Sequence, residues 1–190
     1  MTRLLHPLIL LLAFIASISV SLSADLQKGY DAAQKGDFET AFKEWKPLAK
    51  NGNTKAQFNL GLMYETGRGV PQNYAEAVKW YRLAAEQGLA EAQDNLGANY
   101  EKGKGVIQDF VQAIKWYQLA ANQGHAQAQV SLGKMYYNGK GVPQDFDQAA
   151  KWTLLAANQG DALAQSKMGV MYEAGHGVPK DYVTAFMWYW

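Results

Sequence analysis

Residues 89–124 read LAEAQDNLGANYEKGKGVIQDFVQAIKWYQLAANQG, and this stretch decides the fold because the chain repeats its pattern. A shift of 36 residues aligns four segments without a gap. The four segments begin at Asn53, Leu89, His125 and Asp161. Nine columns hold the same residue in all four segments; in the first segment they are Ala56, Gln57, Gly61, Tyr64, Gly67, Gly69, Val70, Ala77 and Trp80. A fixed period of this length predicts a stack of units, each burying its apolar face against its neighbours.

Each segment contains two predicted helices. The first runs from about Asn53 to Thr66, where apolar residues recur at the spacing of one helical face. Gly67 follows its last turn, and a glycine there is typical of a helix that ends with one residue in the left-handed backbone conformation. Pro71 makes the residue before it extended and so separates the two helices. Asn73 is positioned to cap the second helix, with Glu76 three residues later. The caps of the later second helices are Asp109, Asp145 and Asp181.

A glycine inside the first helix is costly, because glycine in a helix interior loses about 0.5 to 1 kcal/mol relative to alanine. Gly61 nevertheless recurs in every segment. We expect close helix approach here, with the missing side chain making room for a neighbouring Trp or Tyr. The tryptophans at this period, Trp80, Trp116, Trp152 and Trp188, are predicted to form the repeating core.

The pattern from Ala90 onward, AxAQxxLGxxYxxGxGVPxDxxxAxxWxxxAAxxG with Ile107 in place of the proline, resembles the Sel-one-like repeat (SLR), a relative of the tetratricopeptide repeat. The resemblance covers residues 53–190 densely and 25–52 loosely. It implies an all-α fold: a right-handed α-solenoid of antiparallel helix-turn-helix repeats. We divide the chain into a signal peptide (1–24), a degenerate half-repeat (25–52) and repeats at 53–88, 89–124, 125–160 and 161–190, the last of them incomplete.

The resemblance also implies a function. The usual role of such repeats is that of a scaffold or adaptor, so we expect a non-enzymatic module that holds a protein or peptide partner on its concave face. The alternative is an envelope enzyme or binder acting on cell-wall, peptidoglycan-related material. Bacterial relatives linked to that role carry two cysteines per repeat, whereas this chain has none.

Composition narrows the choice of partner. Lys and Arg number 18 and Asp and Glu 17, and Arg3 is the one charged residue of the first 24, so residues 25–190 balance at 17 of each sign. A neutral chain lacks the basic surface of nucleic-acid binders. The absence of cysteine excludes disulfides, thiolate metal sites and cysteine nucleophiles.

The N-terminus is typical of a secretory signal peptide. A basic residue, Arg3, precedes an apolar run over 8–16 and small residues up to Ala24. Cleavage after Ser23 or after Ala24 would yield an exported protein, periplasmic or secreted, with no membrane span. The rival interpretation is an uncleaved anchor, although the run is shorter than the roughly 20 residues of a spanning helix.

Several apparent sites are better explained by the repeat. Gly67-Arg68-Gly69 and its copies lack the spacing of a phosphate-binding loop, so we interpret them as turns whose basic residue faces the end of the preceding helix. We expect His125 and His176 to be solvated. We predict no catalytic residue, cofactor or metal site.

Candidate binding residues come from columns that vary between segments while keeping one face of the first helix. This face is either a groove for an extended peptide or an ordinary solvated surface, and variability alone favours neither. The partner-binding candidates are Asn59, Leu62, Asn95, Ala98, Ser131 and Lys134.

Overall fold

The computed structural model describes residues 25–189, and within that range every regular element is an α-helix. The predicted signal peptide, with its cleavage sites, lies outside the described residues. No helix within 25–189 is long and apolar enough to cross a membrane. A helix over 25–34 comes first. The chain divides into two compact units, Met1–Leu83 and Ala84–Trp190, and each is described by itself.

The first unit holds the half-repeat and most of the first repeat. Its helices after 25–34 are α2 (Phe38–Lys50), α3 (Thr54–Thr66) and the larger part of α4 (Tyr74–Glu86). Their core contains Trp45, Leu60 and Trp80, with Phe38 and Tyr64 packed against it. Each helix in this unit therefore buries one face against the next.

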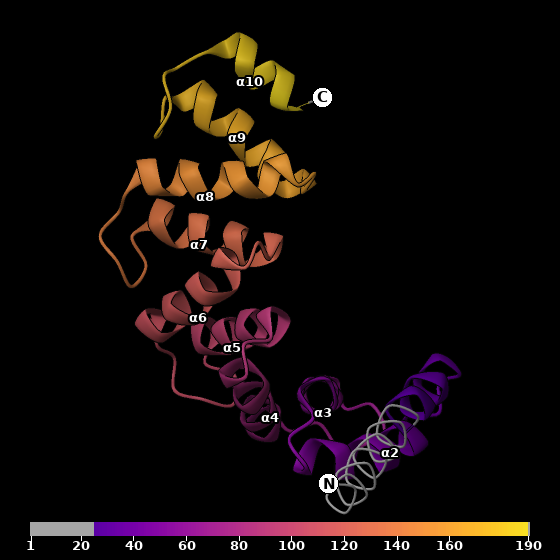
Figure 1. Cartoon of the computed structure of the whole chain (residues 1–190). Helices are drawn as coiled ribbons and strands as arrows, with labels where there is room; N and C mark the ends of the chain where they lie inside the picture. Colours follow the sequence, from indigo (N-terminus) through magenta and orange to yellow (C-terminus); the bar gives the residue numbers. More distant parts are fainter. Residues whose placement is uncertain (1–24, 190) are drawn as a thin grey trace, which may run out of the picture. The chain divides into compact units, whose positions relative to one another are not determined.

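The second unit holds the remaining repeats as a regular stack. The order of its helices is α5 (Ala90–Lys102), α6 (Phe110–Asn122), α7 (Ala126–Asn138), α8 (Phe146–Asn158), α9 (Ala162–Ala174) and α10 (Tyr182–Tyr189). Each packs on the helix that follows it, as the succession from magenta to yellow shows (Figure 1). This confirms the all-α repeat solenoid.

The predicted helix ends are present. Asn73 accepts hydrogen bonds from the backbone N–H groups of Ala75 and Glu76 at 3.0 and 3.1 Å, and Asp145 does the same for Gln148 at 2.9 Å. Gly67 and its three counterparts end the first helices in the left-handed conformation. The cap residues thus have a structural role that accounts for their repetition.

The interior glycine of each first helix allows close packing against a ring, as predicted, and in three of the four repeats the ring is that of a tyrosine. A side chain on Gly97 would begin 2.8 Å from the ring of Tyr117. Gly61 and Gly169 face Tyr81 and Tyr189 in the same way, whereas Gly133 faces Thr153. Trp80, Trp116 and Trp152 are buried, and Trp188 in the last helix is half-buried.

The basic residue of the turn lies over an aromatic ring, a contact that the sequence did not predict. Arg68 lies over the ring of Phe38, 5.3 Å from its centre, and Lys140 lies over Phe110 at 5.6 Å. The second glycine of the turn explains this contact, since a Cβ on Gly141 would meet Phe110 at 2.7 Å. The turn is pressed against the start of an earlier helix, which positions its cation over a ring.

The two histidines, which we expected to be solvated, are half-buried and make specific contacts. His176 stacks on Phe146 with ring centres 4.2 Å apart and is hydrogen-bonded to the hydroxyl of Tyr137 at 2.9 Å. His125 caps α7, its Nδ1 accepting from the N–H of Ala128 at 3.3 Å. Both rings are thus held by contacts that build the repeat.

Candidate functional site

The first helices of the second unit line a common hollow of about 410 Å³, which we call the first-helix groove. Side chains from α5, α7 and α9 form its walls, and Tyr117 from α6 contributes to its floor. Four of the six candidate binding residues meet here: Asn95, Ala98, Ser131 and Lys134. The remaining two, Asn59 and Leu62, line a separate hollow of about 190 Å³ in the first unit.

The six candidate binding residues differ in how far they are exposed to solvent. Lys134 is exposed, Asn95, Ala98 and Ser131 are half-buried, and Asn59 is only 7% exposed. The side-chain amide nitrogen of Asn59 is buried and donates to no group in the described part of the chain. Asn59 is therefore a buried polar group at the edge of its hollow rather than part of a solvated face.

Asp94 is the groove residue that our sequence comparison missed. Its residue surface is 8% exposed, and its Oδ1 accepts no hydrogen bond from the described residues. Its Oδ2 lies 4.0 Å from Nδ1 of His125, which is too long for a hydrogen bond. Burial raises the pKa of the Asp94 carboxyl, an effect that His125 and Lys102 only partly oppose.

The repeat itself marks Asp94 as unusual. The equivalent residues of the other segments are Phe58, Val130 and Ser166, so no other copy places a charge in this column. A core column one turn further along α5 shows a second exception, because Asn99 is buried where Met63, Met135 and Met171 stand elsewhere. A charged residue in an otherwise uncharged column was the signal that could have found this site.

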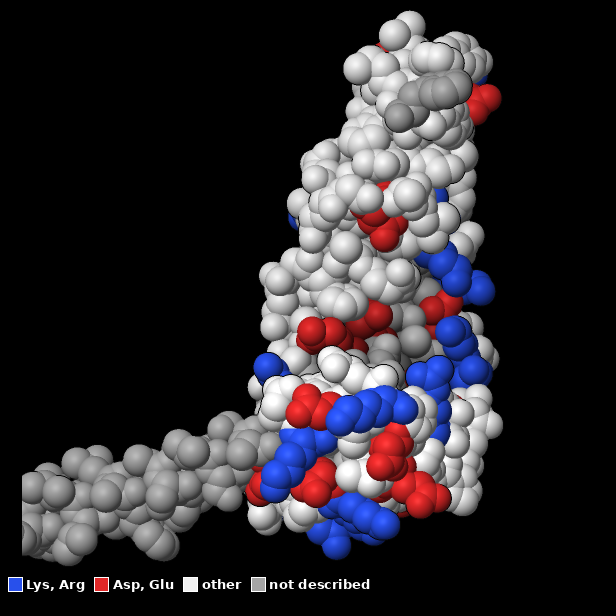
Figure 2. Space-filling model, turned by 90° about the vertical axis from the view of Figure 1, so that its right-hand side faces the viewer, with Lys and Arg blue, Asp and Glu red and all other residues white. Residues whose placement is uncertain are grey.

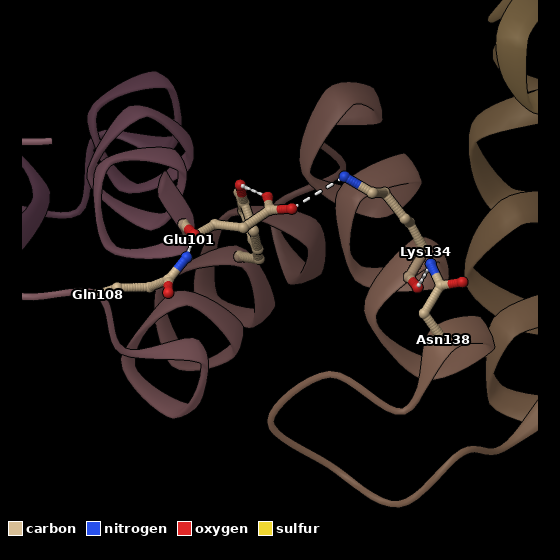
Figure 3. Close-up of polar contacts among 5 residues, drawn as sticks. Glu101, Gln108, Lys134 and Asn138 are labelled. Carbon is tan, nitrogen blue, oxygen red and sulfur yellow. Dashed lines mark hydrogen bonds and ion pairs between the residues drawn. The ribbon is translucent and has the colours of Figure 1, made fainter. Parts of the chain in front are cut away.

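A polar network closes one side of the groove. Lys134 reaches from α7 toward α5 and donates to Oε1 of Glu101 at 2.9 Å (Figure 3). Glu101 also accepts from the hydroxyl of Tyr117 at 2.8 Å. Burial alone would raise the pKa of Glu101, but the bonds from Lys134 and Tyr117 outweigh it and hold that pKa below its usual value.

The groove is mixed in charge. Asp94 and Glu101 face three lysines, of which Lys134 is paired with Glu101 while Lys102 and Lys167 belong to the rim. By contrast, α8 to α10 show few charged side chains on the face seen in Figure 2, and α10 contains none. Within residues 25–189 no group of three or more His, Asp or Glu side chains could hold a metal ion.

A smaller hollow of about 250 Å³ lies beside the groove and shares Lys134 and Lys167 with it. We call it the Gly133 hollow. Gly133, Val170 and Met171 form the apolar part of its wall, and Thr153, Tyr137 and Asn138 complete the lining. The groove and this hollow together make the candidate binding surface of the second unit.

Comparison with known proteins identifies the repeats. The Sel1 repeat pattern matches residues 54–89, 90–125, 126–161 and 162–189. The crystal structure of c5321, a protective antigen of uropathogenic Escherichia coli with an SLR fold, is 38% identical and superposes with a TM-score of 0.86 over 94% of this chain and 39% of that one. A Sel1 repeat protein from Oxalobacter formigenes is 37% identical, with a TM-score of 0.81 over 86% of this chain and 68% of the other.

A shorter stretch of the chain is similar to rodent proteins. A 50-residue stretch is 40% identical to the rat DAP3-binding cell death enhancer 1, covering 26% of this chain and 10% of the rat protein. This chain thus spans only a small part of that relative and 39% of the E. coli antigen. Because the repeat pattern covers most of the sequence, the chain belongs to the Sel1-repeat family.

Proposed function

We propose that this protein is a non-enzymatic scaffold that holds an extended segment of a protein or peptide partner in the first-helix groove. Sel1-repeat proteins are generally protein-interaction scaffolds, which supports the class of function. One observation carries the assignment to the groove: the unpaired Oδ1 of Asp94, buried at its wall. A buried acceptor without a donor is costly, and a partner that supplies the donor removes the cost.

The composition of the groove favours a peptide over other ligands. A peptide backbone offers N–H groups to Asp94, and its side chains can meet both the lysines and the carboxylates of the wall. A nucleic-acid backbone needs a cationic surface, whereas Asp94 and Glu101 offset two of the three lysines here. A bilayer surface needs a broad apolar face, which this groove does not offer.

The experiment is a quantitative capture of partners from the native envelope with matched variants. Asp94→Asn and Ala98→Arg alter the groove, and Asp145→Asn is the control, because it removes the same charge at a helix cap where Asn serves equally well. The specific partner is the protein retained by the parent and by the control but lost from both groove variants.

The opposite pattern would move the site. If the partner survives both groove changes but is lost on replacing Lys104 and Lys140 by alanine, the basic turns are the contact surface and the groove assignment is wrong. Lys134→Glu offers an independent check, since it removes the groove lysine that is paired with Glu101.

We further propose that the protein works outside the cytoplasm, in the periplasm or as a secreted protein. The basic, apolar and small-residue order of residues 1–24 supports this. Sequencing the N-terminus of the exported product should give Ala24 or Asp25 as the first residue. Soluble cytoplasmic protein that retains Met1 would contradict it.

A further inference from the structure

The Gly133 hollow exists because one repeat lacks a ring that the others supply themselves. In three repeats a tyrosine of the second helix lies against the interior glycine of the first helix: Tyr81 on Gly61, Tyr117 on Gly97 and Tyr189 on Gly169. The equivalent residue on Gly133 is Thr153, whose hydroxyl lies where the ring would begin. The chain therefore keeps the glycine that accommodates a ring but not the ring.

The polar partner of the ring is exchanged as well. The tyrosine hydroxyl donates to a glutamate of the first helix in the same three repeats, at 2.6 Å for Glu65, 2.8 Å for Glu101 and 3.1 Å for Glu173. In the third repeat this glutamate column holds Tyr137, whose hydroxyl is hydrogen-bonded to His176 instead. Both members of the usual pair are thus absent from one place.

The space left behind has the size and lining for an aromatic side chain. An apolar cavity of about 150 Å³ is enough to hold benzene, and the Gly133 hollow measures about 250 Å³. Met171 is buried at its wall, whereas Val170 is 47% exposed, so the hollow is open on one side. Lys134 and Lys167 belong to its rim, and ammonium groups attract the face of an aromatic ring.

We propose that the Gly133 hollow receives an aromatic side chain of the bound partner, which takes the place that the chain's own tyrosine fills in the other repeats. This inference rests on the proposed function, since the hollow shares Lys134 and Lys167 with the first-helix groove. The partner segment that lies in the groove therefore carries a Tyr, Phe or Trp at the point where it passes Gly133.

The site can be tested without knowing the partner, using p-cresol, which is the side chain of tyrosine, as the probe. Titration of the isotope-labelled protein should shift the amide signals of Gly133, Thr153 and Val170 in a saturable manner at millimolar concentrations. Acetyl-tyrosine-methylamide should bind at least about tenfold more tightly than its leucine counterpart, a difference of about 1.4 kcal/mol. The absence of a saturable shift at these residues, or equal binding of tyrosine and leucine, would overturn the proposal.

Filling the hollow from within provides the decisive variant. Thr153→Tyr supplies the missing ring and should abolish p-cresol binding, whereas Thr153→Val, which has the same shape as threonine, should bind the probe as the parent does. Circular dichroism verifies that each variant is folded. Should Thr153→Tyr fail to fold, Val170→Glu at the exposed wall is the substitute, and it should weaken p-cresol binding at least about tenfold.

The same variants separate this inference from the proposed function. If the native partner is lost from Asp94→Asn and Ala98→Arg but retained by Thr153→Tyr, the groove stands and the aromatic inference is wrong. If p-cresol binds and Thr153→Tyr blocks it while the groove variants still retain the partner, the hollow stands as an aromatic site and the groove function is wrong.

Discussion

Gln123 donates a side-chain hydrogen bond to the side-chain oxygen of Gln93 at 2.7 Å, and 36 residues later Gln159 does the same to Gln129 at 2.8 Å. Gln93 in turn donates to the backbone oxygen of Ala85 at 3.1 Å, as Gln129 does to Ala121 at 3.2 Å. Each buried glutamine lies on a first helix and thus connects the C-terminal ends of the second helices before and after it. This relay gives the invariant glutamine column a physical reason.

The relay predicts a measurable loss of stability when it is cut. Gln129→Leu removes two hydrogen bonds, one to the oxygen of Ala121, which keeps the N–H of Gly124 at 3.0 Å, and one from the exposed amide of Gln159. A typical hydrogen bond contributes about 0.5 to 1.5 kcal/mol, so the two together predict a loss of about 1 to 3 kcal/mol. Urea unfolding followed by circular dichroism should show a loss of that size. The control is Gln127→Ala on the exposed face of the same helix, expected to change the free energy of unfolding by less than about 0.5 kcal/mol. Equal effects of the two changes would contradict the role of the relay.

Trp116 should behave as a core residue. It is 9% exposed and occupies the same column as the buried Trp80 and Trp152. Trp116→Ala should therefore lower the free energy of unfolding by about 3 to 5 kcal/mol, as large-to-small core changes do. Thermal melts should show a correspondingly lower melting temperature. A variant that melts like the parent but no longer retains the partner would show instead that the tryptophan column is a binding surface.

At neutral pH the charged carboxylate of Asp94 should lower the stability of the protein when no partner is bound. Because burial raises its pKa in the folded state, the folded protein takes up a proton before the unfolded chain does as the pH falls. The penalty is present above the raised pKa and disappears below the usual Asp value of about 3.9. Asp94→Asn should melt a few degrees higher than the parent at pH 7, since about 1 kcal/mol shifts a chain of this size by about 2 to 4 °C.

The difference in melting temperature between Asp94→Asn and the parent should disappear in acid, because both side chains are neutral there. The charged and titratable groups around Asp94 are His125 and Lys134 on or capping α7, Lys167 on α9, Tyr117 on α6, and Lys102 and Glu101 on α5. All of them are common to the two proteins, so the difference between the melts isolates Asp94. A lower melting temperature for Asp94→Asn at pH 7 would mean that His125 already satisfies the carboxylate.

The Lys134 to Glu101 contact should contribute little to stability despite its short distance. Lys134 is 46% exposed, and exposed ion pairs contribute about 0 to 1 kcal/mol. Lys134→Ala should lower the melting temperature only slightly at pH 7. Because the pKa of Glu101 is lowered in the folded state, even this loss should fade as the pH falls through that pKa and the carboxyl is protonated. A large, pH-independent loss would show that Lys134 acts through packing.

The sequence predicted the repeat architecture because repetition reports what every unit needs. The glycine columns, the caps at Asn73 and Asp145, and the buried tryptophans each recur for one local reason that a single repeat already contains. The ring against Gly61 was harder to assign, because Trp80 and Tyr81 are adjacent and the helical register alone does not say which one faces the glycine.

The site was less predictable, since it depends on departures from the repeat. The varying columns led to Asn95, Ala98, Ser131 and Lys134, which the structure places in one groove. Asp94 was missed because its column lies at the border of the core, where Phe58 and Val130 suggest packing alone. The stacking of His176 on Phe146 could not be foreseen either, because it joins residues 30 positions apart through the approach of a turn to a helix start.

The exchange at Thr153 and Tyr137 has a consequence for how such arrays can diversify. Every repeat retains its interior glycine, and in three of the four a tyrosine of the same repeat fills the space beside it, which is a latent binding socket. Removing this tyrosine from another repeat, for example by Tyr117→Thr, would open a second socket without rebuilding the backbone. Tandem duplication followed by the loss of selected tyrosines would then produce a row of sockets at regular intervals. In such a row the spacing of aromatic residues in a ligand, rather than their local chemistry, would determine which array it fits.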